Sequence, residues 1–250
     1  MSKPIPVPVL VTGSSGRIGR AAVAELLHRG HAVRGFDRTP TPGLQDCIIG
    51  DLSDRAALDR AMENIECLVH LAATPDDAPF LESLLPNNIT GLFHVMEAAR
   101  CAGVRRAVLA SSGQVNWWQQ ATGPFPIRPT DPPSPKAWYA ATKMFMESAG
   151  RTYVEMHGMS VIIARLGWCP RTLEQVAEIA ASELFRDVYL SPGDAGRFFA
   201  CAVEAQPEVR HEVVYATSRA LVQPRFDLGS AERALGYVPQ ESWPAGSAEF

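Results

Sequence analysis

The sequence has little that would direct the chain to a membrane or to nucleic acid. None of its apolar runs approaches the roughly 20 residues that a membrane-spanning helix requires, and its first segment lacks the long apolar stretch of a signal peptide. Acidic residues outnumber basic ones by 27 to 23, so the formal net charge is -4 and no basic surface is expected. These absences predict a cytoplasmic protein whose partners are neither nucleic acids nor membranes.

Cysteine is also scarce, with five residues in a chain of 250. The number is odd, and no pair has the spacing of metal ligands; the residues are Cys47, Cys67, Cys101, Cys169 and Cys201. We expect reduced, mostly buried thiols rather than disulfides. No neighbouring residue would activate one of them as a nucleophile, so the sequence predicts no metal site and disfavours a catalytic cysteine.

The first two thirds of the chain alternates short apolar runs with amphipathic stretches. The apolar runs predict strands at residues 6–12, 31–37, 46–50, 66–73, 106–111 and 160–166. Helices are predicted at residues 18–29, 53–64, 88–101 and 139–157, with Ser53 as the N-cap of the second. Because the strands are continuously apolar, we expect an α/β fold in which a doubly wound parallel sheet is covered on both faces.

The rhythm of strands and helices breaks after Gly167. The remainder contains one clear strand, at residues 212–217. We therefore divide the chain into a sheet domain at residues 1–167 and a small substrate-binding lobe at residues 168–250, which is not an independent domain. The lobe is expected at the carboxyl edge of the sheet, because open α/β sheets bind their ligands there.

A glycine-rich turn joins the first predicted strand to the first helix. Gly13 would allow the tight turn, Gly16 would let a pyrophosphate approach the backbone, and Gly19 would let helix and strand pack closely. The N-terminus of the helix would then offer free N–H groups to the phosphates. The alternative is an ordinary glycine-rich turn without a ligand, but the position directly after an N-terminal strand favours dinucleotide binding.

Two acidic residues predict which dinucleotide binds. Asp37 ends the second strand, where a carboxylate accepts hydrogen bonds from ribose hydroxyls and repels a 2′-phosphate, so NAD is favoured. Arg38 follows it and could tolerate that phosphate, which leaves NADP open; Asp37 could also be a solvated turn residue. Asp51 and Leu52 follow the third strand, where the carboxylate could accept from the adenine amino group.

Tyr139 and Lys143 are four residues apart on a predicted helix and therefore share a face. With five tyrosines and three lysines in the chain, roughly 0.06 such pairs are expected by chance, so the pair is informative. Moving a hydride from a carbinol carbon also requires a base for the hydroxyl proton. A tyrosine becomes that base if its pKa falls by about three units, roughly 4 kcal/mol, and an adjacent ammonium could supply much of this, as could a positive nicotinamide ring. Ser112, after the fifth strand, is placed to hold the reacting oxygen, with Ser111 as the alternative.

Together these motifs resemble the extended short-chain dehydrogenase/reductase superfamily, and within it the NAD-dependent epimerase/dehydratase family. The resemblance covers roughly residues 7 to 170 and returns weakly at residues 225–228 and 235–237. It implies a Rossmann-type fold and a catalytic triad of Ser112, Tyr139 and Lys143, in which the lysine also holds the nicotinamide ribose. It implies a structural or relay role for Asn88. The further cofactor-binding residues that it implies, besides the glycines and acids above, are Ser15, Arg17, Ile18, Leu71, Ala72, Ala73, Asn88, Ser111, Tyr139 and Lys143.

The short C-terminal segment favours a small sugar or sugar acid as the substrate, because family members that act on sugar nucleotides usually have a larger one. The chain most resembles the uronate dehydrogenases, but it differs at Gly113-Gln114, where those enzymes have Asn-His, and at Trp168, where they have Ser. Arg171 and Arg197 are the candidates for binding a carboxylate. A sugar-nucleotide epimerase or dehydratase, and a non-catalytic dinucleotide sensor, are the alternative functions.

Aromatic residues gather in sequence around the predicted site. Gln114, Trp117, Trp168 and Arg171 are the predicted substrate contacts, since aromatic faces suit sugar rings. Trp118 and Trp138 are also near, and each tryptophan could instead serve core or lid packing. The proline-rich segment at residues 123–135 is expected to form a stiff loop beside the substrate.

The resemblance also predicts a homodimer. In the family, the helices that correspond to residues 88–101 and 139–157 form a four-helix interface. The apolar contacts would come from Met144, Phe145, Ala149 and Met156.

Overall fold

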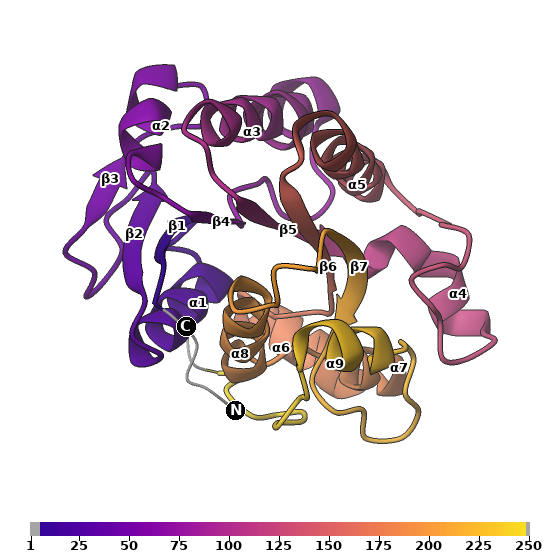
Figure 1. Ribbon diagram of the computed structural model, residues 1–250. Helices are drawn as coiled ribbons and strands as arrows, with labels where there is room; N and C mark the ends of the chain where they lie inside the picture. Colours follow the sequence, from indigo (N-terminus) through magenta and orange to yellow (C-terminus); the bar gives the residue numbers. More distant parts are fainter. Residues whose placement is uncertain (1–5, 249–250) are drawn as a thin grey trace.

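Seven parallel strands form one sheet in the computed structural model, which describes residues 6–248. Their order is β3-β2-β1-β4-β5-β6-β7 (Figure 1). β1 pairs with β2 on one side and with β4 on the other. The direction in which the chain adds strands therefore reverses between β1 and β4, and the carboxyl ends of these two strands form a topological switch point. The strands are β1 (Pro8–Thr12), β2 (Ala32–Asp37), β3 (Cys47–Ile49), β4 (Cys67–His70), β5 (Arg106–Ser112), β6 (Ser160–Leu166) and β7 (His211–Ala216).

Helices cover both faces of this sheet, and alternate residues of the strands divide between two cores. Val9 and Val11 of β1 pack with α1 (Arg17–His28) and α8 (Pro192–Val203). Leu10 faces the other way and packs with α2 (Arg55–Met62), α3 (Gly91–Cys101) and α5 (Trp138–His157), which lie above the sheet in Figure 1. The shorter helices are α4 (Trp117–Thr122), α6 (Leu173–Ala181), α7 (Glu183–Asp187) and α9 (Gly229–Leu235).

The six strands and four helices predicted before Gly167 are all present, with small shifts at most ends. The predicted N-cap Ser53 is wrong: Asp54 is the N-cap of α2, and its carboxylate accepts from the Ala57 amide at 3.0 Å. The helix expected to begin at residue 88 is preceded by a π-helix, Phe80–Thr90, which contains Pro86 and continues into α3. No helix among residues 6–248 is long and apolar enough to cross a membrane.

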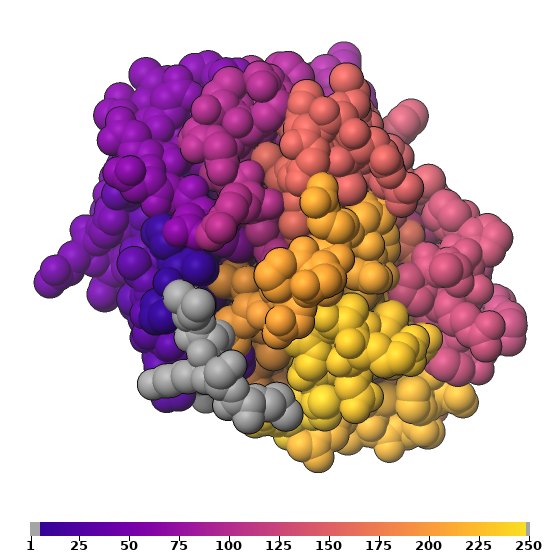
Figure 2. Space-filling model, viewed as in Figure 1, coloured from indigo at the N-terminus to yellow at the C-terminus, as the bar shows by residue number. Residues whose placement is uncertain are grey.

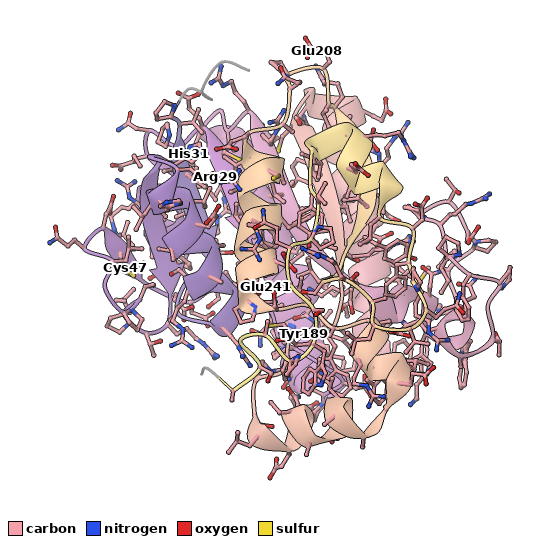
Figure 3. All side chains as sticks on the ribbon, turned by 90° about the horizontal axis from the view of Figure 1, so that it is seen from below. Arg29, His31, Cys47, Tyr189, Glu208 and Glu241 are labelled. Carbon is pink, nitrogen blue, oxygen red and sulfur yellow. The ribbon has the colours of Figure 1, made fainter. Side chains whose placement is uncertain are left out.

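The segment after Gly167 joins the same sheet. The predicted strand at residues 212–217 is β7, which pairs in parallel with β6. Helix α8 packs so closely on α1 that a Cβ at Gly196 would lie 2.7 Å from the Ala21 carbonyl oxygen. Glu204, at the end of α8, binds Arg29 at 2.7 Å and His31 at 3.1 Å. Figure 3 labels Arg29 and His31, which lie close together. This segment therefore contributes to the sheet layers, and its role as a substrate-binding lobe stays a prediction.

The proline-rich loop at residues 123–135 packs against the C-terminal segment. Ile127 pairs with Phe226 in an isolated parallel bridge, and both are buried in a small cluster with Val188 and Tyr215. Figure 2 shows the two segments in contact at the surface, where the yellow C-terminal part meets the pink one. These contacts join the loop to the part of the chain that follows β6.

Candidate active site

A cavity of about 1160 Å³ runs along the carboxyl ends of the strands, which exceeds the usual volume of a small-molecule pocket. It crosses the switch point between β1 and β4. Of the residues predicted to bind cofactor or substrate or to act in catalysis, all but Asn88 and Arg197 line it: Gly13, Ser15, Gly16, Arg17, Ile18, Gly19, Asp37, Asp51, Leu52, Leu71, Ala72, Ala73, Ser111, Ser112, Gln114, Trp117, Tyr139, Lys143, Trp168 and Arg171.

The glycine-rich turn leaves a cradle that side chains would fill. Gly13 has φ +71°, and a Cβ there would lie 2.7 Å from the Ala72 amide nitrogen, while a Cβ on Gly19 would overlap the Gly13 carbonyl oxygen. Helix α1 follows with Gly16 as its N-cap, no capping side chain and no acidic residue in its first turn. Its N–H groups and positive dipole end therefore suit a diphosphate.

Arg17 ties this turn to two distant segments. Its side chain is buried and donates to the carbonyl oxygens of Pro170, Gly246 and Ser247. The loop after β6 and the segment at residues 246–247 are thus held against the glycine-rich turn.

Two carboxylates stand at the end of the cavity formed by β2 and β3. Asp37 accepts from the Ser15 amide at 3.0 Å, and Arg38 lines the cavity beside it. The Asp51 carboxylate accepts from both the amide and the hydroxyl of Ser53, and these bonds lower its pKa. The arrangement suits the hydroxyls of a ribose at Asp37 and an amino group at Asp51.

Asn88 lies below the cavity rather than in its wall. Its side chain accepts from the Thr74 amide at 2.8 Å and donates to the Thr74 carbonyl and the Thr142 hydroxyl, each at 3.1 Å. It thereby ties the loop after β4 to α5. These contacts fit the structural role, the first of the two that the resemblance implied, and the cofactor-binding role of Asn88 stays a prediction.

Tyr139 and Lys143 both enter the cavity from the first two turns of α5. The Lys143 ammonium lies 5.4 Å from the centre of the Tyr139 ring and donates to the Ala110 carbonyl at 2.8 Å. Ser112 lowers the pKa of Tyr139 and accepts from the Gln114 amide at 3.1 Å. Ser111 instead donates to Glu147 at 2.7 Å, so Ser112 is the serine that acts on the tyrosine.

Burial dominates the acidities of this pair. It raises the pKa of Tyr139 to about 12. The negative charge of Asp76 raises this pKa further, whereas Ser112 and the positive charge of Arg171 lower it. Burial also lowers the pKa of Lys143 to about 8. The chain alone therefore does not lower the pKa of Tyr139, because losing water disfavours the phenolate more than its neighbours favour it. The expected lowering by Lys143 together with a positive nicotinamide ring stays a prediction.

The start of α5 is held by a residue that the sequence analysis missed. Ala137, the N-cap, has no side chain that could bind the first amides, and Asp77, from the loop after β4, accepts from the Tyr139 amide at 3.1 Å. The preceding Asp76 lines the cavity and pairs with Arg171. Two adjacent acids directly after the fourth strand were the signal that could have found them.

The aromatic residues divide between the cavity and the surface. Trp117 and Trp168 line the cavity; Lys136 lies 4.5 Å from the Trp117 ring, and Phe185 packs edge-on to Trp168 at 4.8 Å. Trp118 and Trp138 are exposed and outside it. Further lining residues that the sequence did not single out include Phe36, Thr74, Asn87, Gln120, Gln175, Glu178 and Phe226.

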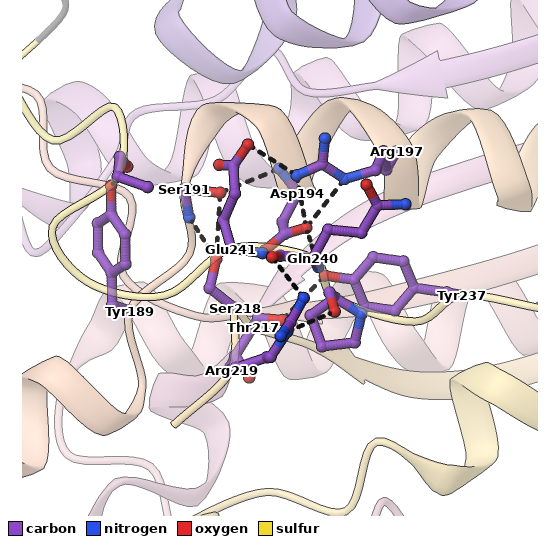
Figure 4. Close-up of polar contacts among 12 residues, drawn as sticks. Tyr189, Ser191, Asp194, Arg197, Thr217, Ser218, Arg219, Tyr237, Gln240 and Glu241 are labelled. Carbon is purple, nitrogen blue, oxygen red and sulfur yellow. Dashed lines mark hydrogen bonds and ion pairs between the residues drawn. The ribbon is translucent and has the colours of Figure 1, made fainter. Parts of the chain in front are cut away.

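Of the two arginines considered for a carboxylate, only Arg171 reaches the cavity. Arg197 binds Asp194 at 2.8 Å and Glu241 at 2.9 Å in a separate polar cluster that anchors residues 240–241 to α8 (Figure 4). Arg197 is therefore not a substrate contact.

The described residues contain no group of three or more histidine, cysteine or acidic side chains that could hold a metal ion. All five cysteines are free thiols, and only Cys67 and Cys169 are fully buried, so the expectation of mostly buried thiols is wrong. Burial raises the pKa of Cys67 to about 12 and that of Cys169 to about 11, which leaves both as unreactive thiols.

Comparison with known proteins gives a consistent picture. Residues 9–168 match the NAD dependent epimerase/dehydratase family. The chain is 33% identical to the L-arabinose 1-dehydrogenase (NAD(P)(+)) of Haloferax volcanii, over 94% of this chain and 96% of that protein. It is 32% identical to the NAD-dependent glucose-6-phosphate dehydrogenase of the same organism, over 97% and 95%. The crystal structure of glucuronic acid dehydrogenase from Chromohalobacter salexigens superposes with a TM-score of 0.80 at 26% identity, over 96% and 86%.

Proposed function

Since the chain belongs to the NAD-dependent epimerase/dehydratase family, we propose that it is an NAD-dependent oxidoreductase that oxidises a hydroxyl of a small sugar or sugar acid, or catalyses the reverse reduction. The observation that carries this proposal is a single cavity lined both by the glycine-rich turn and by Ser112, Tyr139 and Lys143, of which Ser112 and Lys143 are buried and Tyr139 is half-buried. Its relatives are named for a neutral sugar and a sugar phosphate, and a solved neighbour for a sugar acid.

The cofactor would occupy the cavity lengthwise. The turn at Gly13–Gly19 and the amides of α1 would hold its diphosphate, Asp37 its adenosine ribose, and Asp51 with Leu52 its adenine. Leu71, Ala72 and Ala73 would line the path toward Tyr139 and Lys143, where the nicotinamide ribose would bind. When bound, oxidised NAD accepts a hydride and brings a positive charge.

The chain's own residues would hold the reacting oxygen and move its proton. Ser112 donates a hydrogen bond to that oxygen, and the Tyr139 phenolate accepts the hydroxyl proton as the carbinol carbon loses its hydride and becomes a carbonyl. Because burial raises the pKa of Tyr139 to about 12, forming the phenolate depends on positive charge nearby. The chain's own sources are Arg171, which lowers this pKa, and the Lys143 ammonium, 5.4 Å from the ring centre. In the reverse direction the same phenol is the proton donor.

The preference between dinucleotides tests the role of Asp37. The wild-type protein is expected to bind NAD more tightly than NADP, and Asp37→Ala should weaken NAD by about tenfold through the loss of charge-assisted hydrogen bonds. Calorimetric titration with both dinucleotides measures this. The control Asp59→Ala removes an exposed acid of α2 that does not line the cavity and should change neither affinity. Tighter NADP binding by the wild type would show that the assignment is wrong.

The proposed activity itself is tested by NADH absorbance with aldoses, hexuronic acids and nucleotide sugars. A nucleotide sugar converted without net NADH would indicate an epimerase or dehydratase instead. NAD binding without conversion of any of these compounds would indicate a dinucleotide sensor.

We also propose that the protein is a homodimer formed through α3 and α5. These helices lie side by side, joined by the Tyr153 hydroxyl, which donates to Glu97 at 2.6 Å, and they expose Phe93 (56%), Phe145 (44%) and Met156 (71%). Met144 and Ala149 are half-buried on the same helix. Light scattering at micromolar concentration should give twice the mass of one chain, and the double variant Phe145→Asp, Met156→Asp should give a monomer. A monomeric wild type would refute the proposal.

The five free thiols suit a reducing compartment. We therefore propose the cytoplasm as the place where the reaction occurs.

A further inference from the structure

Two loops meet over the cavity through oppositely charged side chains. Asp76 follows β4 and Arg171 follows β6, and their side chains form an ion pair. Gln175, in the first turn of α6, donates to the Asp76 carboxylate at 3.4 Å and accepts from the Arg171 amide at 2.7 Å. All three residues line the cavity, so the ion pair is part of its wall.

This pair lies close to the proposed reacting group. Asp76 raises the pKa of Tyr139 and Arg171 lowers it, so both charges act on the phenol. The neighbouring Asp77 binds the Tyr139 amide directly. A substrate whose hydroxyl reaches Tyr139 therefore contacts, or passes beside, Asp76 and Arg171.

The part of the cavity around Tyr139, which we call the substrate half, has no arginine free to bind an anionic substrate. Among its described lining residues, the acids are Asp76, Asp77 and Glu178, and the bases are Lys136, Lys143 and Arg171. The Lys143 ammonium donates to the Ala110 carbonyl, and Arg171 is paired with Asp76. A carboxylate or phosphate that approached Arg171 would displace Asp76 or lie against it, and like charges at contact distance repel strongly.

An uncharged sugar meets a more favourable surface. Its hydroxyls both donate and accept, so they can bind Asp76 and Arg171 at once without separating the two charges. Amide side chains add donors and acceptors, and Trp117 and Trp168 offer apolar faces to a ring. The neutral polar residues of this part of the wall include Ser83, Asn87, Gln114, Gln120 and Gln175.

We propose that the Asp76–Arg171 ion pair makes the site selective for neutral sugars over hexuronic acids and sugar phosphates. The proposal rests on the proposed function and specifies its substrate class. Asp76 is then a specificity-determining residue, because its carboxylate pairs with Arg171, the one arginine that lines the substrate half of the cavity.

The test compares kcat/KM with NAD for L-arabinose, D-galactose, D-glucuronate and glucose 6-phosphate. For the wild type, the better neutral sugar should exceed both anionic sugars by at least about tenfold. Asp76→Asn keeps the shape of the side chain and frees Arg171, so it should raise kcat/KM for D-glucuronate relative to that neutral sugar by about tenfold or more, mainly through KM. The pair is partly exposed and contributes little to stability, so the variant is expected to fold.

The matched control is Asp46→Asn, which removes a comparable ion pair, with Arg34 at 3.0 Å, outside the cavity. It should leave the ratio of the two substrates unchanged. A wild type that prefers D-glucuronate or glucose 6-phosphate overturns the inference and leaves the proposed function standing. The same holds if neither Asp76→Asn nor Asp76→Ser changes the ratio of kcat/KM for D-glucuronate to that for the neutral sugar. If the protein binds NAD but none of the four sugars yields NADH, the proposed function is wrong and the inference falls with it.

Discussion

Tyr139→Phe is expected to lower turnover by about 10²–10⁴-fold, the loss typical of a positioned acid or base. The substitution removes only the hydroxyl and keeps the ring that packs at the start of α5. Affinity for NAD should be nearly unchanged, because the contacts expected at the diphosphate and the adenosine are distant from the phenol. Steady-state kinetics on a sugar that the wild type oxidises, together with a calorimetric titration of NAD, measures both quantities.

Tyr153→Phe is the matched control for that substitution. Tyr153 lies on the same helix, and its hydroxyl donates to Glu97 outside the cavity. The control should retain nearly full turnover. Full activity of Tyr139→Phe on a sugar that the wild type oxidises would contradict the assignment of the tyrosine as the acid/base.

Replacing Lys143 should reduce turnover by about 10²-fold or more, because it removes a positive charge 5.4 Å from the centre of the Tyr139 ring. Lys143→Ala should also weaken NAD, if the lysine holds the nicotinamide ribose as the resemblance implies. Lys143→Met keeps most of the apolar stem and removes the charge. Equal turnover in wild type and Lys143→Met would contradict this role.

Stability separates this functional role from a structural one. Burial lowers the pKa of Lys143 from 10.5 to about 8, so holding its charged form in the fold costs roughly 3 kcal/mol below pH 8. Since the unfolded chain binds the proton more tightly, this contribution makes the wild type more stable as the pH rises from about 8 to 10.5. Urea unfolding should show that rise in the wild type and not in Lys143→Met, which should be at least as stable at pH 7.

The fold and the part of the cavity proposed to bind the cofactor could be predicted because their sequence signals are local. A continuously apolar run predicts a buried strand, and the spacing of Gly13, Gly16 and Gly19 follows from one turn whose close contacts exclude side chains. The four-residue spacing of Tyr139 and Lys143 is equally local, since one helix presents both.

The part of the cavity proposed to bind the substrate is formed by residues that are distant in sequence. Asp76 and Arg171 are 95 residues apart, and their pairing exists only once the loops after β4 and β6 are brought together. The same holds for Asp77, which caps α5 across 62 residues. The raised pKa of Tyr139 was also beyond the sequence, because it depends on how completely the folded chain removes water from the phenol.

The most direct test of the account is the formation of NADH from NAD by the wild-type protein with neutral aldoses, hexuronic acids, sugar phosphates and nucleotide sugars. We predict that NADH accumulates with at least one small sugar, in proportion to the sugar consumed. A protein that binds NAD, is folded, and produces no NADH with any of these compounds would contradict the account.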